Sequence, residues 1–305
     1  MVQGRFQTLF FGDSIVWGQG LREEDKFSTW VVQWLNEYHP ELRAFKTVKA
    51  HSGAIIGAGD TDVDPQWPGE VPSYYPTIPQ QVASYSDTDP EDVDLIVIGG
   101  GINDVNIRSI FNPRTTHDDL RSKIRYACGT LLKDLLLTAA AKFQNPRTRI
   151  LVLGYYPVLS GESKPVGVIP MMSAMGIPTV GPDGWNPWRT VVGNALLFES
   201  YTDEWIQRSI SEANAMNPGR FVWVKPRILA ENAAFAPQPW VFGVRLPQMT
   251  AEDDVVDARR LQCMIQPDPD QRALCFRASA GHPNRWGARA YFNAINQVIQ
   301  REYGL

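Results

Sequence analysis

Ser14 is the first residue of this sequence whose type and place suit covalent chemistry. It follows an apolar run at residues 6–11, typical of a buried strand, and a Gly-Asp pair. A hydroxyl at a strand end is exposed, but it needs a base to act as a nucleophile. Of the four histidines, His282 is the best placed base, because it lies between a glycine and a proline just ahead of the last helical pattern. A serine at this position also commonly caps a helix, so the pair alone leaves both readings open.

Two further apolar runs end in groups that suit acyl transfer. Gly53 follows the second run, and Asn103 follows three consecutive glycines after the third. Acyl transfer needs hydrogen-bond donors aimed at the oxygen on which negative charge develops, and the Gly53 N–H and the Asn103 amide are such donors. The structural alternative is a tight strand exit, with Asn103 as a turn or cap residue.

The elements that must position these residues form a regular alternation. Buried parallel strands are predicted at residues 6–11, 44–49, 95–99, 150–154 and 221–224, and helices at residues 28–38, 118–143, 201–216 and 286–300. This order predicts an α/β fold, a three-layer flavodoxin-like sandwich with a five-stranded parallel sheet. Such sheets bind ligands at the carboxyl ends of their strands, where Ser14, Gly53 and Asn103 lie.

Long passages interrupt the alternation near residues 57–79, 160–200 and 226–280. We interpret them as loop insertions that build the substrate pocket of a single domain over residues 1–305, since loops of this length are usually functional or disordered. The uncharged run at residues 165–182 is broken by proline and glycine. It therefore predicts an apolar loop and no integral membrane span.

Methionine and tryptophan side chains in and near these insertions are pocket candidates. The methionines suit either an adaptable wall for an acyl chain or ordinary core filling, and the tryptophans suit either a platform for a sugar or aryl group or the core. The residues concerned are Met171, Met172, Met175, Trp17, Trp67, Trp185 and Trp188.

The four separated blocks resemble those of the SGNH (GDSL) hydrolase family of serine esterases and lipases. In family order the matching positions are Gly12-Asp13-Ser14, Gly53, Gly101-x-Asn103-Asp104 and His282. The resemblance implies that Ser14 is the nucleophile and His282 the general base. It also implies an oxyanion hole made by the N–H groups of Ser14 and Gly53 and the Asn103 side chain. The implied activity is hydrolysis of carboxylic esters through an acyl-enzyme, without a cofactor.

One position departs from the family pattern. The family usually carries an aspartate three residues before the histidine, which orients the imidazole, and here that position is Ser279. Three interpretations stay open: a Ser-His dyad whose imidazole donates to a backbone carbonyl, an orienting carboxylate from elsewhere, or an inactive relative. The candidate carboxylates are Asp253, Asp254 and Asp257. We favour the dyad.

Composition and motifs limit the partners. The chain has 29 basic and 33 acidic residues, which argues against a nucleic-acid partner. Neither a nucleotide-binding glycine motif nor metal-ligand spacing is present, so no cofactor and no metal are expected. The expected partner is a small-molecule or polysaccharide ester, with polysaccharide O-acetyl groups as an alternative substrate class. A non-catalytic carbohydrate- or lipid-binding module on the same fold is the alternative function.

The cysteines bear on the compartment. Cys263 and Cys275 lie close together in a segment rich in proline and aspartate, and either form a disulfide or stay reduced and buried like Cys128. The opening residues lack a signal-peptide pattern, so the chain is expected to be cytoplasmic or to have lost a signal. A bridge between the two cysteines would favour secretion.

Overall fold

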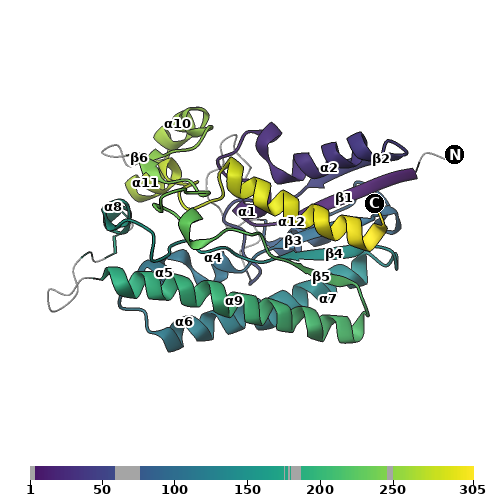
Figure 1. Ribbon diagram of the computed structural model, residues 1–305, viewed down its shortest axis with the longest axis horizontal. Coiled ribbons are helices and arrows are strands. Elements are labelled where there is room, and N and C mark those ends of the chain that lie inside the picture. The colour runs from purple at the N-terminus through teal and green to yellow at the C-terminus, as the bar shows by residue number, and fades with distance from the viewer. Residues whose placement is uncertain (1–3, 59–75, 175, 178, 180–186, 246–249) are drawn as a thin grey trace.

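A five-stranded parallel sheet forms the centre of the protein. The computed structural model describes residues 4–58, 76–174, 176–177, 179, 187–245 and 250–305. The strand order is β2-β1-β3-β4-β5 (Figure 1). The strands are β1 (Gly4–Gly12), β2 (Leu42–Val48), β3 (Leu95–Gly99), β4 (Arg149–Leu153) and β5 (Phe221–Val224). The predicted sheet is confirmed, and β3 and β5 have the predicted bounds.

The sheet could be predicted from the sequence because its central strands are buried and therefore apolar. All five residues of β3 are buried, as expected for a central parallel strand covered on both faces. β1 and β3 pair up to their ends, where Gly12 faces Gly99. A Cβ atom on Gly12 would lie 2.4 Å from the Gly99 carbonyl oxygen, so only glycine fits at the end of β1.

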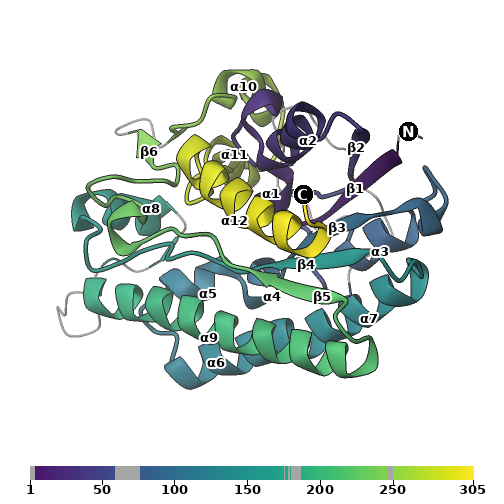
Figure 2. The same cartoon turned by 45° about the vertical axis from the view of Figure 1, so that its right-hand side comes forward.

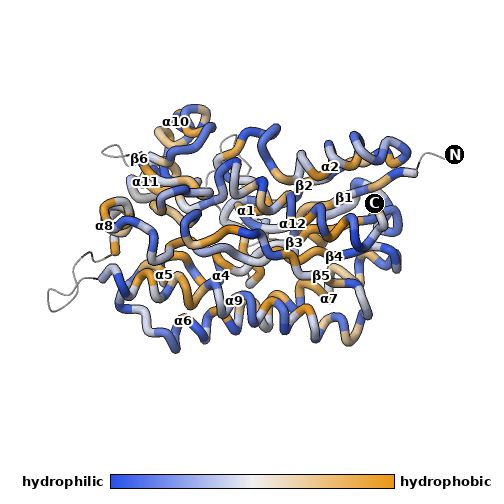
Figure 3. Tube along the Cα trace, viewed as in Figure 1, coloured by the Kyte–Doolittle hydropathy of each residue, from blue (hydrophilic) through white to orange (hydrophobic). Residues whose placement is uncertain are grey.

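Helices cover both faces of the sheet. Figures 1 and 2 show α2 and α12 on one face and α6, α7 and α9 on the other, which makes three layers. The longer helices are α2 (Phe27–Tyr38), α6 (His117–Ile124), α7 (Leu132–Lys142), α8 (Pro165–Ala174), α9 (Trp188–Met216), α10 (Val256–Met264), α11 (Pro269–Phe276) and α12 (Arg285–Tyr303). The short ones are α1 (Ser14–Trp17), α3 (Ile78–Ala83), α4 (Ile102–Val105) and α5 (Ile107–Phe111), and a π-helical segment, Arg125–Leu131, joins α6 to α7. Figure 3 shows hydrophobic residues gathered along the central strands, between these layers.

The predicted loop at residues 165–182 is wrong over its first part, which forms α8. The helix begins at Pro165, where the missing N–H of proline costs nothing, although Pro170 lies inside it. Burial of Met171 and Met172 in the core stabilises the helix despite that proline. α9 likewise begins at Trp188 and not at residue 201, because buried side chains such as Val191 and Phe198 continue its apolar face. Much of the supposed 160–200 insertion is therefore regular helix.

The passage at residues 226–280 is also more regular than expected. It contains α10, α11 and a short antiparallel pair, β6 (Val244–Arg245) and β7 (Thr250–Ala251). A disulfide between Cys263 and Cys275 joins α10 to α11, as the sequence allowed, and Cys128 is free and buried. Most of the 57–79 passage lies outside the described residues. Across the described part of the chain, the helices are all too short or too polar to span a bilayer.

Candidate functional site

The nucleophile candidate stands at the junction of β1 and α1. The Asp13 carboxylate caps α1 by accepting a hydrogen bond from the Ile15 N–H at 2.9 Å, which makes Ser14 the first residue of the helix. Burial raises the Asp13 pKa to about 7, against the effect of the backbone N–H groups that bind it. The Ser14 side chain lies 2.7 Å from His282, measured from Oγ to Nε2. The structure therefore joins the two residues that the sequence paired.

A short backbone ladder holds His282 in place. The Phe242 N–H donates to the His282 carbonyl at 2.8 Å, and the His282 N–H donates to the Ser279 carbonyl at 2.9 Å. Two residues later, the Asn284 side chain caps α12 by accepting a hydrogen bond from the Trp286 N–H. The imidazole thus comes from a segment that is fixed on both sides of the residue.

The electrostatics of His282 favour a neutral ring. Burial lowers its pKa to about 4, while the nearby carbonyls of Ser279 and Ala280 act in the opposite direction. Arg259 lowers this pKa further, and Asp253 raises it. At neutral pH the ring is unprotonated at one nitrogen, which is the form that can accept a proton from Ser14.

The position of the missing acid holds a buried polar cluster. Ser279 donates a hydrogen bond to the Asp253 carboxylate, which also pairs with the Arg259 guanidinium. The Asp253 and Arg259 side chains are both fully buried, at 0% exposure. Asp254 and Asp257 are exposed. Within the described residues, Nδ1 of His282 has no hydrogen-bond partner, so none of the four candidate orienting residues hydrogen-bonds it.

The proposed oxyanion donors lie on the loops that follow β2 and β3. Gly53 adopts a φ of 76°, in the left-handed region that favours glycine. The Asn103 Nδ2 donates to the Ala54 carbonyl at 3.0 Å, which fixes the amide beside the Gly53 loop. Nδ2 carries two hydrogens, so one remains for another acceptor. The N–H of Ser14 has no intrahelical acceptor, because it belongs to the first turn of a helix.

Asp104 and Tyr155 brace these two loops. The Asp104 carboxylate accepts from the Ile56 N–H at 2.9 Å and the Gly57 N–H at 2.7 Å, which ties the asparagine block to the Gly53 loop. Burial raises the pKa of Asp104, and these backbone donors oppose that change. The Tyr155 hydroxyl accepts from the Ile102 N–H at 2.8 Å. The donors are therefore held by a preformed network.

Sequence reasoning missed Tyr155 and Arg259 as supports of the site. Tyr155 gave no local signal, since it reaches the Asn103 loop from the end of β4. Arg259 did give one, because it lies between Val256 and Cys263 at the spacing of one helix face, and all three are buried on α10. A charged residue on an apolar helix face requires a buried partner.

The methionine and tryptophan side chains that were pocket candidates differ in where the structure places them. Met171 and Met172 belong to the hydrophobic core, and Trp17 and Trp188 are partly buried against it, which favours ordinary packing for these four. Met175, Trp67 and Trp185 lie outside the described residues. His51 is buried, with its Nδ1 2.9 Å from the Ser52 carbonyl oxygen.

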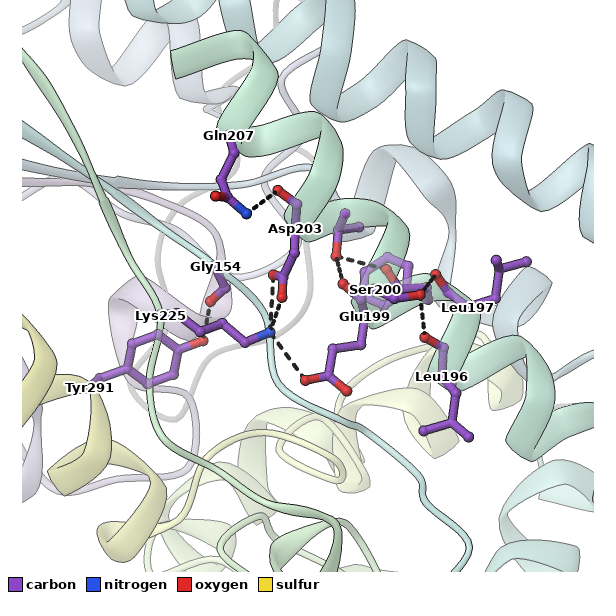
Figure 4. Close-up of polar contacts among 11 residues, drawn as sticks. Gly154, Leu196, Leu197, Glu199, Ser200, Asp203, Gln207, Lys225 and Tyr291 are labelled. Atoms are coloured by element: carbon purple, nitrogen blue, oxygen red, sulfur yellow. Dashed lines mark hydrogen bonds and ion pairs between the residues drawn. The ribbon is translucent and has the colours of Figure 1, made fainter. Parts of the chain in front are cut away.

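A charged cluster lies at the same edge of the sheet, at the end of β5. Figure 4 shows Lys225 reaching between Glu199 and Asp203, which are one turn apart on α9; the ammonium lies 3.1 Å from Glu199 and 2.8 Å from Asp203. Burial raises the pKa of both carboxyls, and Lys225 opposes this. Beside it the Tyr291 hydroxyl donates to the Gly154 carbonyl at 2.9 Å. These contacts tie the ends of β4 and β5 to α9 and α12. The described residues contain no group of three or more acidic, His or Cys side chains that could hold a metal ion.

Comparison with known proteins gives a family and a fold. Residues 10–190 match the model of the GDSL-like Lipase/Acylhydrolase family. The structure is similar to a phospholipase A1 from Streptomyces albidoflavus NA297, with a TM-score of 0.50 and 14% identity over 96% of this chain and 98% of that chain. It also matches a carbohydrate esterase family 2 enzyme with a carbohydrate-binding domain from Corynascus thermopiles (Myceliophthora fergusii), with a TM-score of 0.48 and 14% identity over 98% of this chain and 67% of that chain. A search of curated protein sequences gives no match.

Proposed function

The chain belongs to the GDSL-like lipase/acylhydrolase family, and on that basis we propose that it hydrolyses carboxylic esters through an acyl-enzyme on Ser14. The observation that carries this proposal is the 2.7 Å contact between the Ser14 Oγ and the His282 Nε2. A nucleophile and base within hydrogen-bond reach are the minimum that serine catalysis requires.

The proposed reaction has two halves. In the first, the His282 Nε2 takes the proton of Ser14 as Oγ attacks the ester carbonyl carbon. The N–H groups of Ser14 and Gly53 and the Asn103 amide then stabilise the oxyanion, and the imidazolium protonates the departing alcohol. In the second half, His282 takes a proton from a water molecule that attacks the acyl carbon. The bond from that carbon to Oγ then breaks, the imidazolium returns the proton to Ser14 Oγ, and the acid leaves.

We propose that Ser14 and His282 act as a dyad. When Nε2 accepts the serine proton, the resting ring must carry its hydrogen on Nδ1. The carbonyls of Ser279 and Ala280 lie close enough to raise the pKa of the ring, whereas the candidate carboxylates make no hydrogen bond to it within the described residues. Nδ1 has no hydrogen-bond partner among the described residues, so we propose that the Ser279 or Ala280 carbonyl accepts its hydrogen when the imidazolium forms, in the place that an aspartate has in a triad.

The substrate class is tested by a panel. Hydrolysis of p-nitrophenyl esters from C2 to C10 should be compared with release of acetate from an acetylated polysaccharide, each with the Ser14→Ala variant as blank. Turnover of any ester that depends on Ser14 supports the proposal. Binding of a carbohydrate or lipid with no Ser14-dependent turnover would instead support a non-catalytic module.

Asn103→Ala is expected to lower kcat by about 10²–10³-fold, with little change in KM, because the lost amide acts on the transition-state oxyanion. Asn103→Asp has nearly the same shape but cannot donate when ionised, so its loss should be at least as large. Steady-state kinetics together with thermal unfolding separates this effect from misfolding. Near-normal kcat in both variants would remove Asn103 from the oxyanion hole.

As the pH is lowered, kcat/KM should begin to fall only at an unusually low pH. Hydrolysis requires neutral His282, and burial lowers its pKa to about 4. The rate should therefore stay level as pH falls from 7 to about 5, and then drop about tenfold per pH unit below 4, since one protonation abolishes the base. A limb centred near pH 6.5, the value of an unperturbed histidine, would contradict this account.

Asp253→Asn should destabilise the fold more than it slows the reaction. The change removes the carboxylate that pairs with the buried Arg259, and breaking a buried ion pair typically costs about 3–5 kcal/mol. Loss of the acid in a conventional triad lowers kcat by about 10⁴-fold, and the folded variant should lose far less than that. Asp254→Asn is the matched control, because Asp254 is adjacent and exposed. Denaturant unfolding and kcat are measured for both; a 10⁴-fold loss of kcat in stable Asp253→Asn would make Asp253 the orienting acid.

A further inference from the structure

Gln81 makes a paired contact with the backbone just ahead of the nucleophile. Its Oε1 accepts from the Gly12 N–H at 2.8 Å, and its Nε2 donates to the Gly12 carbonyl at 2.9 Å. The second hydrogen of Nε2 reaches the Pro76 carbonyl at 3.3 Å. Gln81 is buried, at 1% exposure. A side-chain amide thus binds one backbone residue at both its donor and its acceptor.

The Gln81 amide takes the place that a residue of β2 would have beside Gly12, because β2 ends before it reaches that position. β2 ends at Val48, and the chain beyond it donates to Phe10 through Lys49 and to the Gly12 carbonyl through His51. No backbone carbonyl of the described residues takes the Gly12 N–H on that side. A buried N–H without a partner is costly, and the amide of Gln81 supplies the acceptor as a neighbouring peptide group would.

The helix that carries Gln81 is firmly placed. The N-terminus of α3 is closed by a capping box, in which Thr77 and Gln80 each bind the other's backbone N–H, at 3.3 and 2.8 Å. Ile78 and Val82 on the same helix are fully buried in the core. Gln81 is therefore a fixed support for Gly12 and not an adaptable one.

The segment that Gln81 holds leads directly into the proposed catalytic machinery. Gly12 is followed by the helix cap Asp13 and then by Ser14, whose N–H and Oγ both take part in the proposed reaction. A shift of the Gly12 backbone would be passed on through Asp13 to the Ser14 N–H and would change the distance from Oγ to His282. A misplacement of about 1 Å can cost about 10²-fold in rate.

We propose that Gln81 is a positioning residue for Ser14, which sets the orientation of the nucleophile through its paired hydrogen bonds to Gly12. The proposal rests on the proposed function, because it concerns the same serine. Gln81 acts on Ser14 only through the Gly12 backbone and touches no group of the proposed reaction, so its loss should reduce kcat and leave KM nearly unchanged.

Gln81→Glu gives a pH-dependent test. An ionised glutamate still accepts from the Gly12 N–H but repels the Gly12 carbonyl, whereas a protonated one accepts and donates as glutamine does. Burial raises the pKa of such a carboxyl, so the protonated form dominates at pH 5 and the ionised form grows as the pH rises to 8. We expect kcat at pH 8 to be at least tenfold below that of the unmodified protein, and the difference to shrink several-fold at pH 5.

Two control variants on the same helix separate positioning from charge and stability. Gln80→Glu adds the same charge one residue earlier and keeps the acceptor for Thr77, so it should show no such pH dependence. Val82→Ala weakens the packing of α3 without touching Gly12, so it should unfold more easily and keep its kcat. Wild-type kcat in Gln81→Glu at pH 8 would overturn the proposal. So would unfolding of that variant at pH 8 in parallel with its loss of activity, as followed by circular dichroism.

A second readout does not depend on catalysis. Hydrogen exchange at the Gly12 and Ser14 amides should be faster in Gln81→Met than in Val82→Ala variants of equal or lower stability. If the unmodified protein shows no Ser14-dependent hydrolysis, the proposed function fails, but the exchange comparison still decides whether Gln81 holds this backbone. Equal exchange in the two variants would refute the positioning role.

Discussion

Ser14→Ala is expected to lower kcat for ester hydrolysis by about 10⁵–10⁶-fold, the scale seen when a serine hydrolase loses its nucleophile. The remaining rate should still exceed that in water, because the oxyanion donors and binding contacts persist. The fold should survive, since the Asp13 side chain and not that of Ser14 caps α1. Initial-rate kinetics on a p-nitrophenyl ester and a thermal melt measure the two effects.

Ser200→Ala is the matched control for this change. Ser200 lies on the exposed side of α9, where its hydroxyl donates to the Leu196 carbonyl of the same helix at 3.0 Å (Figure 4). Its loss should leave kcat unchanged. A Ser14→Ala variant that keeps even about a hundredth of the activity would show that another group attacks the ester.

His282→Ala should produce a loss of similar size, about 10⁵–10⁶-fold in kcat. The two residues act as one unit, so the double variant Ser14→Ala/His282→Ala should be no worse than either single change. His117→Ala is the control, since His117 is exposed at the start of α6. Losses that multiply in the double variant would mean that Ser14 and His282 act independently, against the 2.7 Å contact between them.

The sheet and the site edge were predictable because their signals are local. Most of the strands contain a short apolar run, β2 being the mixed and partly exposed exception, and the chemical groups follow the strands closely, so the topology alone brings Ser14, Gly53 and Asn103 to one edge. His282 was recognisable from its place ahead of α12. These inferences needed no knowledge of packing.

The helices that the sequence did not reveal depend on packing. α8 contains an internal proline and a glycine, so local propensity argues against it, whereas α10 and α11 consist mostly of good helix formers and were obscured by the aspartates and prolines around them. Burial of residues such as Met172 and the bridge between Cys263 and Cys275 stabilise them. Tertiary contacts override propensity in such places.

The polar supports of the site were hidden for a different reason. Gln81 binds Gly12 across 69 positions of sequence, and Ser279 binds Asp253 across 26. Nothing in a single sequence connects such residues, because neither spacing nor composition encodes a contact between distant segments. The place of the missing aspartate was visible, but the buried Asp253–Arg259 pair behind it was not.

The central claim is that Ser14 is the nucleophile, and covalent labelling tests it most directly. A fluorophosphonate probe should add once to the protein, and peptide mass spectrometry should place the adduct on Ser14. The adduct should be absent in Ser14→Ala and form far more slowly in His282→Ala. Ester hydrolysis by a protein that is not labelled at Ser14, or that is labelled elsewhere while Ser14→Ala stays active, would contradict the account.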